Sequence, residues 1–312
     1  MAAGIEQIPV IDFSLFHTDP EECARQVGVA SQGIGFFYLM NHGVDQDMID
    51  RMFTQSEKYF AQEFPEKLKY PIKTHNNGYS PFLSERCFNI RANATKSEYA
   101  HAFSMFDADT CEEVEKFFKD MYSVAQQVMQ CFALSLKIPE QDGGMHFFDK
   151  SHVWEDESGT TLRFLRYPQQ DRDSGIPSAG AHSDYGSCTL LLQRRIPGLE
   201  VQANRTHDNV PWVAAPVIPG SILVNIGDLL QKWTNGLLKS TKHRVVFHEM
   251  QRTSPRYSIA CFIQPSNDAR LDPIPSPVIT QLTQPQVHEN NVMTAKEYLD
   301  FKLNATYGDL EY

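Results

Sequence analysis

Between residues 161 and 264, short runs of β-branched and aromatic residues alternate with Gly, Pro and Asn. Each run is too short for an ordinary helix, and its composition is typical of a strand. Several short strands at this spacing predict an antiparallel sandwich or barrel. The expected strands are 161–167, 179–184, 188–193, 199–203, 210–214, 221–226, 241–247 and 256–264.

Helical patterns flank this β-rich region on both sides. Apolar residues recur at three- and four-residue steps in 20–32, from about Asp45 onward, and in 111–137, which is the period of an amphipathic helix. Near the C-terminus, Thr294 and Glu297 have the spacing of a capping box and are expected to begin a last helix.

The other N-terminal segments are less regular. Short apolar strands are expected at 8–13 and 34–40. Residues 65–95 are polar and rich in Asn and Pro, and we expect them to be irregular.

Three residues of the β-rich region form a candidate metal site. His182 and Asp184 are two positions apart in one expected strand, so both side chains would lie on the same face. His243 lies in another expected strand. Two imidazoles and one carboxylate can hold a non-haem iron and leave positions open for small ligands. A zinc hydrolase can use the same set, so a second motif is needed to distinguish the metals.

The second motif follows thirteen positions after His243. Arg256 and Ser258 are again an i, i+2 pair, which places a cation beside a hydroxyl on one face of a strand. This pair is suited to binding a carboxylate. A metallohydrolase needs a water and a general base rather than an anion clamp, so the pair favours iron.

These motifs and three other segments resemble the iron(II)- and 2-oxoglutarate-dependent dioxygenases. The branch is the one that includes isopenicillin N synthase and many oxygenases of secondary metabolism. The three segments are Ile8–Phe13, Gly35–Val44 and Gly220–Asp228. Within the branch, Leu162–Pro168 and Tyr298–Tyr307 are most similar to the fungal thymine-7-hydroxylase-like oxygenases.

The resemblance implies a fold and a domain organisation. The fold is mainly β with flanking helices (α+β), built on a double-stranded β-helix, or jelly roll. One domain would span 1–312, with a helical N-terminal part at 1–95, a jelly-roll catalytic core at 160–265 and a C-terminal helix at 293–306.

The resemblance also implies the cofactors and the roles of site residues. His182, Asp184 and His243 would bind iron(II) and form the catalytic centre. Arg256 and Ser258 would bind the far carboxylate of the co-substrate 2-oxoglutarate. The co-substrate and O2 would become succinate and CO2 while a small molecule is oxidised, most often hydroxylated, with ascorbate as a candidate activator.

A third residue, Tyr167, matches a family tyrosine that supports the co-substrate, although it could equally be a barrel tyrosine with a satisfied hydroxyl. If Tyr167 faces the site, strand alternation puts Leu165 and Arg163 on the same face. An arginine inside a barrel needs a partner. The partner of Arg163 could be a buried structural acid, or a substrate that carries a carboxylate, a phenolate or a carbonyl-rich ring.

Alternative functions share much of this pattern. A same-fold oxidase that does not use 2-oxoglutarate keeps both motifs, as does an oxygenase that desaturates, closes or expands a ring. A non-catalytic binding module would have lost one of the motifs, and both are intact here.

Charge and composition restrict the partners and the compartment. The formal net charge is −11, which disfavours nucleic acid as a partner. No apolar run is long enough to span a bilayer, and the N-terminus has no features of a secretory signal. The six cysteines include no Cys-x-x-Cys pair. We therefore expect a cytoplasmic protein that acts on a small molecule, away from membranes.

Overall fold

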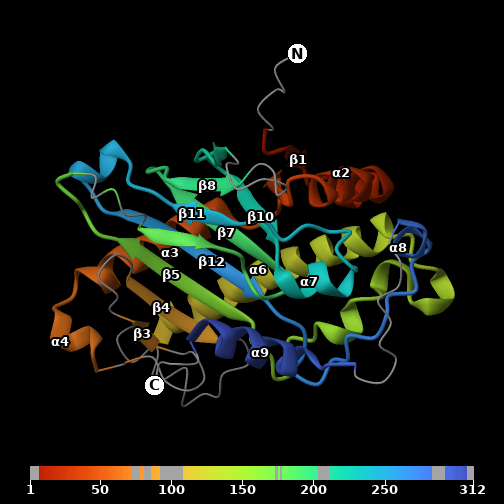
Figure 1. Ribbon diagram of the computed structural model, residues 1–312. Coiled ribbons are helices and arrows are strands. Elements are labelled where there is room, and N and C mark those ends of the chain that lie inside the picture. The colour runs from red at the N-terminus through yellow and green to blue at the C-terminus, as the bar shows by residue number, and fades with distance from the viewer. Residues whose placement is uncertain are drawn as a thin grey trace.

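The structure is a computed structural model of the 312-residue chain. It describes residues 7–69, 71, 78–80, 86–91, 108–172, 175, 178–202, 211–282 and 292–307. Within these residues, the strands form a large sheet and a small sheet that lie against each other, with helices outside (Figure 1).

The large sheet is antiparallel except at one edge, where its first two strands are parallel. In spatial order its eight described strands are β1 (Val10–Asp12), β2 (Phe36–Met40), β10 (Ile222–Ile226), β7 (Cys188–Arg194), β12 (Arg256–Ile263), β5 (Thr161–Tyr167), β4 (Arg86–Arg91) and β3 (Gly78–Ser80).

The small sheet is antiparallel throughout its described part. In spatial order its strands are β6 (Ala179–His182), β11 (His243–Val245), β8 (Leu199–Gln202) and β9 (Trp212–Ala214). The two packed sheets form the expected jelly-roll core.

The two faces of the large sheet bury different groups. On β12, Ile259 and Cys261 belong to a core shared with the helices. Between them, Ala260 packs in a second core with Leu199 and Val245 of the small sheet. This alternation is the period of two that a strand requires. The face that carries Ala260 is called the interior face below.

Three long helices cover the outer face: α2 (Pro20–Gln32), α3 (Gln46–Ala61) and α6 (Ala108–Ser135). In Figure 1, α6 runs behind the large sheet. The shorter helices are α1 (Leu15–Thr18), α4 (Phe64–Lys67), α7 (Asp228–Trp233) and α8 (Pro277–Leu282), with 3-10 turns at Glu140–Asp142, Gly144–His146, Asp149–Ser151 and Glu249–Arg252.

The C-terminal helix α9 (Ala295–Tyr307) begins where the capping box predicted. Glu297 N–H donates to Thr294 Oγ1 at 3.2 Å, and Thr294 N–H donates to Glu297 Oε2 at 2.8 Å. Both bonds satisfy amides that the first turn leaves without helical partners.

The sequence-based expectation for the segment 65–95 is wrong. The segment 65–95 is not wholly irregular, because it contains β3 and β4, and β4 pairs with β5 along its whole length. The polar, turn-rich composition of the segment concealed strands that are stabilised by pairing with a distant part of the chain. Parts of 65–95 lie outside the described residues.

No helix in the described part of the chain combines the length and the apolar character needed to cross a bilayer. The six cysteines are free thiols.

A buried histidine joins the 3-10 turn Asp149–Ser151 to the start of β7. His152 Nδ1–H donates to Phe148 O at 3.0 Å, and Nε2 accepts from Ser187 Oγ at 2.9 Å. Burial lowers the pKa of His152 to about 4 from 6.5, so the folded protein holds the ring neutral.

This histidine predicts a loss of stability in acid. Below pH 6.5 the His152 side chain is protonated in the unfolded chain but stays neutral in the folded protein. The free energy of unfolding therefore falls as the pH drops from 6.5 to 4. The pKa difference corresponds to about 3 kcal/mol. Urea unfolding of wild type and His152→Gln between pH 4.5 and 7.5 tests this, because glutamine can form both hydrogen bonds without titrating. Parallel stability curves for the two proteins would contradict it.

Candidate functional site

The two histidines predicted to bind metal lie side by side on adjacent strands of the small sheet. His182 ends β6 and is the register partner of His243, the first residue of β11. Their ring centroids are 4.3 Å apart. The His243 ring is sheltered by the edge of Phe36, 5.5 Å away, whereas the His182 side chain is 48% exposed. The site is therefore open to solvent on the side of His182.

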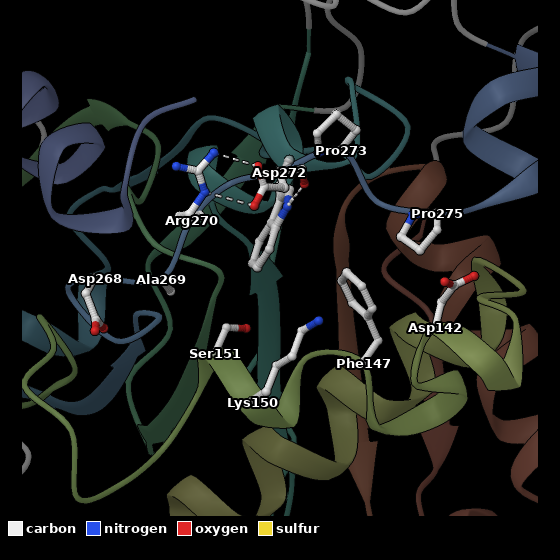
Figure 2. Close-up of a pocket in the computed structure, with 11 residues that line it drawn as sticks. Asp142, Phe147, Lys150, Ser151, Asp268, Ala269, Arg270, Asp272, Pro273 and Pro275 are labelled. Atoms are coloured by element: carbon white, nitrogen blue, oxygen red, sulfur yellow. Dashed lines mark hydrogen bonds and ion pairs between the residues drawn. The ribbon is translucent and has the colours of Figure 1, made fainter. Parts of the chain in front are cut away.

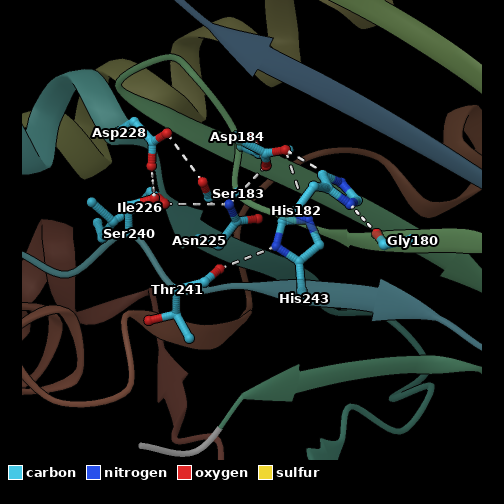
Figure 3. Close-up of polar contacts among 11 residues, drawn as sticks. Gly180, His182, Ser183, Asp184, Asn225, Ile226, Asp228, Ser240, Thr241 and His243 are labelled. Atoms are coloured by element: carbon cyan, nitrogen blue, oxygen red, sulfur yellow. Dashed lines mark hydrogen bonds and ion pairs between the residues drawn. The ribbon is translucent and has the colours of Figure 1, made fainter. Parts of the chain in front are cut away.

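The third candidate, Asp184, does not lie in the strand. The expected strand 179–184 ends at His182, and Asp184 sits in the loop that follows. The loop turns its carboxylate toward both rings, with Oδ1 3.9 Å from His182 Nε2 and 3.7 Å from His243 Nε2 (Figure 3). One ligand atom from each residue lies within 4.8 Å of the others. Strand alternation thus selected three residues that the structure does bring together, although its local geometry was partly wrong.

Hydrogen bonds orient each of these side chains toward the common centre. His182 Nδ1–H donates to Gly180 O at 2.7 Å, and His243 Nδ1–H donates to Thr241 O at 3.2 Å. Since a carbonyl oxygen only accepts, both rings have an unprotonated Nε2 when neutral, and that nitrogen faces the centre. This tautomer suits a metal ligand.

Two neutral donors from the large sheet hold the other oxygen of the carboxylate. Asp184 Oδ2 accepts from Thr189 Oγ1 at 2.6 Å and from Asn225 Nδ2 at 2.8 Å. Oδ1 is thereby directed at the imidazoles. The roles of Thr189 and Asn225 were not anticipated from the sequence, although Asn225 is a polar residue within a buried apolar run.

The pKa shifts of Asp184 and His243 favour protonation states that suit a bound cation. Burial would raise the pKa of the Asp184 carboxyl, but the two imidazoles and the two hydrogen bonds hold that pKa below its usual value. Burial lowers the pKa of His243. One ionised carboxylate and neutral imidazole are the protonation states that a divalent metal requires.

The second motif, Arg256 and Ser258, lies on the interior face of the large sheet. Arg256 is 1% exposed, and its Nη2–H donates to Gln193 Oε1 at 2.9 Å. Its Nη1–H points at Ser258 Oγ, 3.5 Å away. Tyr167 is the register partner of Arg256 on β5, and its ring centre is 5.0 Å from the guanidinium carbon. The structure therefore brings together Arg256 and Ser258, which were predicted to bind a carboxylate, with Tyr167, which was predicted to support the co-substrate, and adds Gln193.

A glycine lets the small sheet approach this arginine. Gly198 has a φ of +137°, and a Cβ at this position would lie 2.7 Å from Val246 O and 3.7 Å from the Arg256 side chain. Val246 N–H also donates to Gly198 O at 2.8 Å. Only glycine fits both the backbone conformation and the space.

The remaining predicted residues, Arg163 and Leu165, also lie on the interior face. Leu165 packs in the core between the sheets. Arg163 Nε–H donates to Asn89 Oδ1 at 2.8 Å, and its guanidinium carbon is 5.0 Å from the centre of the Phe262 ring. In the described part of the chain, Arg163 contacts two neutral side chains, Asn89 and Phe262, instead of the acidic partner considered from the sequence.

A cavity of about 500 Å³ is lined by a different set of residues (Figure 2). Its lining includes Phe147, Lys150, Trp233, Arg270 and Asp272. It contains none of the residues that the sequence singled out, so the candidate site is defined by the side-chain geometry around His182 rather than by this cavity.

Two packed sheets that carry a His–Asp–His set and a buried arginine define a jelly-roll oxygenase that uses non-haem iron. Comparison with known families agrees. Residues 8–127 match the family described as non-haem dioxygenase in morphine synthesis N-terminal, and residues 158–265 match the 2OG-Fe(II) oxygenase superfamily.

Whole-length relatives support the same assignment. A UPF0676 protein of Schizosaccharomyces pombe is 33% identical over 98% of this chain and 94% of its own length. A 2-oxoglutarate-dependent dioxygenase of Didymella fabae is 30% identical over 92% and 91%, respectively. The chain belongs to the 2OG-Fe(II) oxygenase superfamily, and it is an iron(II)- and 2-oxoglutarate-dependent dioxygenase.

A solved structure from the branch expected from the sequence is also similar. It is a full-length Neurospora crassa protein in complex with alpha-KG and thymine. It superimposes with a TM-score of 0.83, at 27% identity, over 98% of this chain and 99% of that one. The same protein in complex with alpha-KG and 5-formyluracil gives a TM-score of 0.83 at 29% identity.

Proposed function

We propose that this dioxygenase hydroxylates a small, planar, carbonyl-bearing molecule, with iron(II) bound by His182, Asp184 and His243. The observation that carries the proposal is the pairing of that set with the buried Arg256 and Ser258 on the interior face. A metal set alone would fit several chemistries, whereas the added anion site fits a keto acid that chelates the metal at one end.

The spacing along β7 fits such a bridging co-substrate. Thr189 contacts the carboxylate of Asp184, and Gln193, four residues further on the same face, contacts Arg256. Four residues of a strand span about 13 Å. Side chains that reach inward from both ends leave room for a short dicarboxylic acid between them. Arg256 would bind its far carboxylate with two parallel hydrogen bonds, and Ser258 would add a third.

Iron(II) with 2-oxoglutarate would supply the activation of O2, and succinate and CO2 would be the by-products. The protein groups position the reactants. Asp184 and the two imidazoles would hold the metal. Leu165 and the apolar core around it would exclude water from the reacting C–H bond.

Arg163 would recognise the substrate. Its guanidinium is oriented by Asn89 and lies beside Phe262, so a planar ring could pack on the phenyl group while its carbonyl oxygen accepts from Arg163. The carbonyl-bearing rings bound by the Neurospora crassa protein are consistent with this chemistry. The net charge of −11 supports a diffusible small molecule rather than nucleic acid as the substrate. We also propose that the enzyme acts in the cytoplasm.

The metal assignment predicts that His182→Ala and His243→Ala each lose bound iron(II) and turnover while the fold is retained. Iron content, succinate formation and circular dichroism would measure these three properties. His248→Ala is the control, because His248 caps the turn Glu249–Arg252 and should keep iron. One iron per chain in both site variants would refute the assignment.

The proposed binding of the 2-oxoglutarate carboxylate by Arg256 predicts a selective effect of Arg256→Lys. Lysine keeps the charge but loses the two-pronged geometry, so the KM for 2-oxoglutarate should rise about 10- to 100-fold while iron binding persists. Arg244→Lys is the matched control, because Arg244 pairs with Glu200 and stacks on Trp212. An unchanged KM in Arg256→Lys would show that Arg256 does not bind the carboxylate of 2-oxoglutarate.

The substrate site predicts that Arg163→Leu lowers the substrate-stimulated formation of succinate at least about tenfold. Iron binding and the slow, substrate-independent consumption of 2-oxoglutarate should persist. A panel of carbonyl-bearing heterocycles would identify the stimulating compound. Arg166→Leu is the control, because strand alternation turns Arg166 to the other face. Loss of iron or of folding in Arg163→Leu alone would mean that Arg163 is structural.

A further inference from the structure

A single carboxylate touches both chain segments that carry the candidate metal ligands. Asp228, the first residue of α7, accepts from Ser183 Oγ at 3.0 Å through Oδ2 and from Ser240 Oγ at 2.5 Å through Oδ1 (Figure 3). Ser183 lies between His182 and Asp184 in the sequence, and Ser240 is three residues before His243. The carboxylate therefore ties the two segments to each other.

The backbone around Asp228 reinforces this tie. Asp228 N–H donates to Asp184 O at 2.7 Å, and Gly227 N–H donates to Ser187 O at 2.9 Å. Gly227 has no Cβ, and a Cβ there would collide with the carbonyl of Gly186. The start of α7 is thus packed directly on the loop that carries Asp184, so a displacement of Asp228 is transmitted to that ligand.

The C-terminal helix also contacts this carboxylate. Lys302 Nζ of α9 is 2.6 Å from Asp228 Oδ2, and the two side chains are only 27% and 12% exposed. The same ammonium lies 5.3 Å from the centre of the Tyr185 ring, next to Asp184 in the chain. By contrast, the Lys296–Asp300 pair on α9 is 57% and 50% exposed, so solvent screens it strongly.

We propose that Lys302 is a positioning residue of the metal site: it holds the Asp228 carboxylate in the orientation that joins the Ser183 and Ser240 segments. The C-terminal helix is then part of the metal centre, although it supplies no ligand. The proposal rests on the ligand set proposed above.

The direction in which metal affinity changes when Lys302 is removed distinguishes a positioning role from simple charge repulsion. A lysine near a metal repels the cation, so if charge were all that mattered, removal of Lys302 would tighten metal binding. If Lys302 positions the ligands, its removal lets the carboxylate turn toward solvent, and binding weakens. Groups that orient metal ligands through a second contact typically change affinity 10- to 100-fold.

Titration of the metal-free, full-length protein with Co(II), followed by the visible absorption of the bound ion, provides the test. We expect Lys302→Met to weaken Co(II) binding about tenfold and to change the absorption spectrum. Lys302→Arg, which can keep the ion pair, should restore the affinity to within about twofold. Lys296→Met on the same helix is the control and should bind as wild type. Unchanged or tighter binding by Lys302→Met would overturn the proposal.

A second variant covers the case in which Lys302→Met does not fold. Ser183→Ala combined with Ser240→Ala keeps the ion pair but separates Asp228 from both ligand segments. About tenfold weaker Co(II) binding would support the proposal, and wild-type affinity would overturn it. His243→Ala in the same titration separates the two hypotheses: if it binds Co(II) normally, the ligand set itself is wrong, whatever Lys302 does.

Discussion

The site depends on one buried carboxylate that is shared between the two sheets. Asp184 follows the small sheet, but its Oδ2 is held by Thr189 and Asn225 of the large sheet. A buried charge is costly unless hydrogen bonds and neighbouring charges compensate for it. Here two hydrogen bonds supply part of that compensation, and a cation bound at Oδ1 would supply the rest. Metal binding and the packing of the two sheets are therefore expected to be coupled.

The alternation of side chains on the large sheet extends this coupling to substrate binding. Thr189, Gln193 and Arg256 all lie on the interior face, and Gln193 contacts Arg256. The opposite face packs on the helices. The proposed functions are spaced along this face: Thr189 contacts the metal ligand Asp184, Gln193 and Arg256 lie at the proposed co-substrate carboxylate, and Arg163 lies beside them on β5. The strands hold Thr189, Gln193 and Arg256 at fixed spacings, which favours a precise site.

Much of this arrangement could be predicted, because periodicity is local. The expected strand at 161–167 matches β5, the helix at 20–32 matches α2, and the capping box at Thr294 begins α9. The ligand residues were predicted from spacing and family resemblance. What failed depends on contacts between distant segments. The pairing of β4 with β5 brings Asn89 next to Arg163, which is 74 residues away in the sequence. No local sequence pattern predicts this contact. The link from Lys302 to Asp228 has the same character, since it joins helices that are far apart in the chain.

The central claim is that one iron(II) and one 2-oxoglutarate bind together, with the metal at the His–Asp–His set and the far carboxylate at Arg256. The most direct measurement is an anaerobic titration, first with iron(II) and then with 2-oxoglutarate, followed by visible absorption. The account predicts a metal-to-ligand charge-transfer band that appears only when both are present and saturates at one equivalent of each per chain. Iron binding without such a band on addition of 2-oxoglutarate would contradict it.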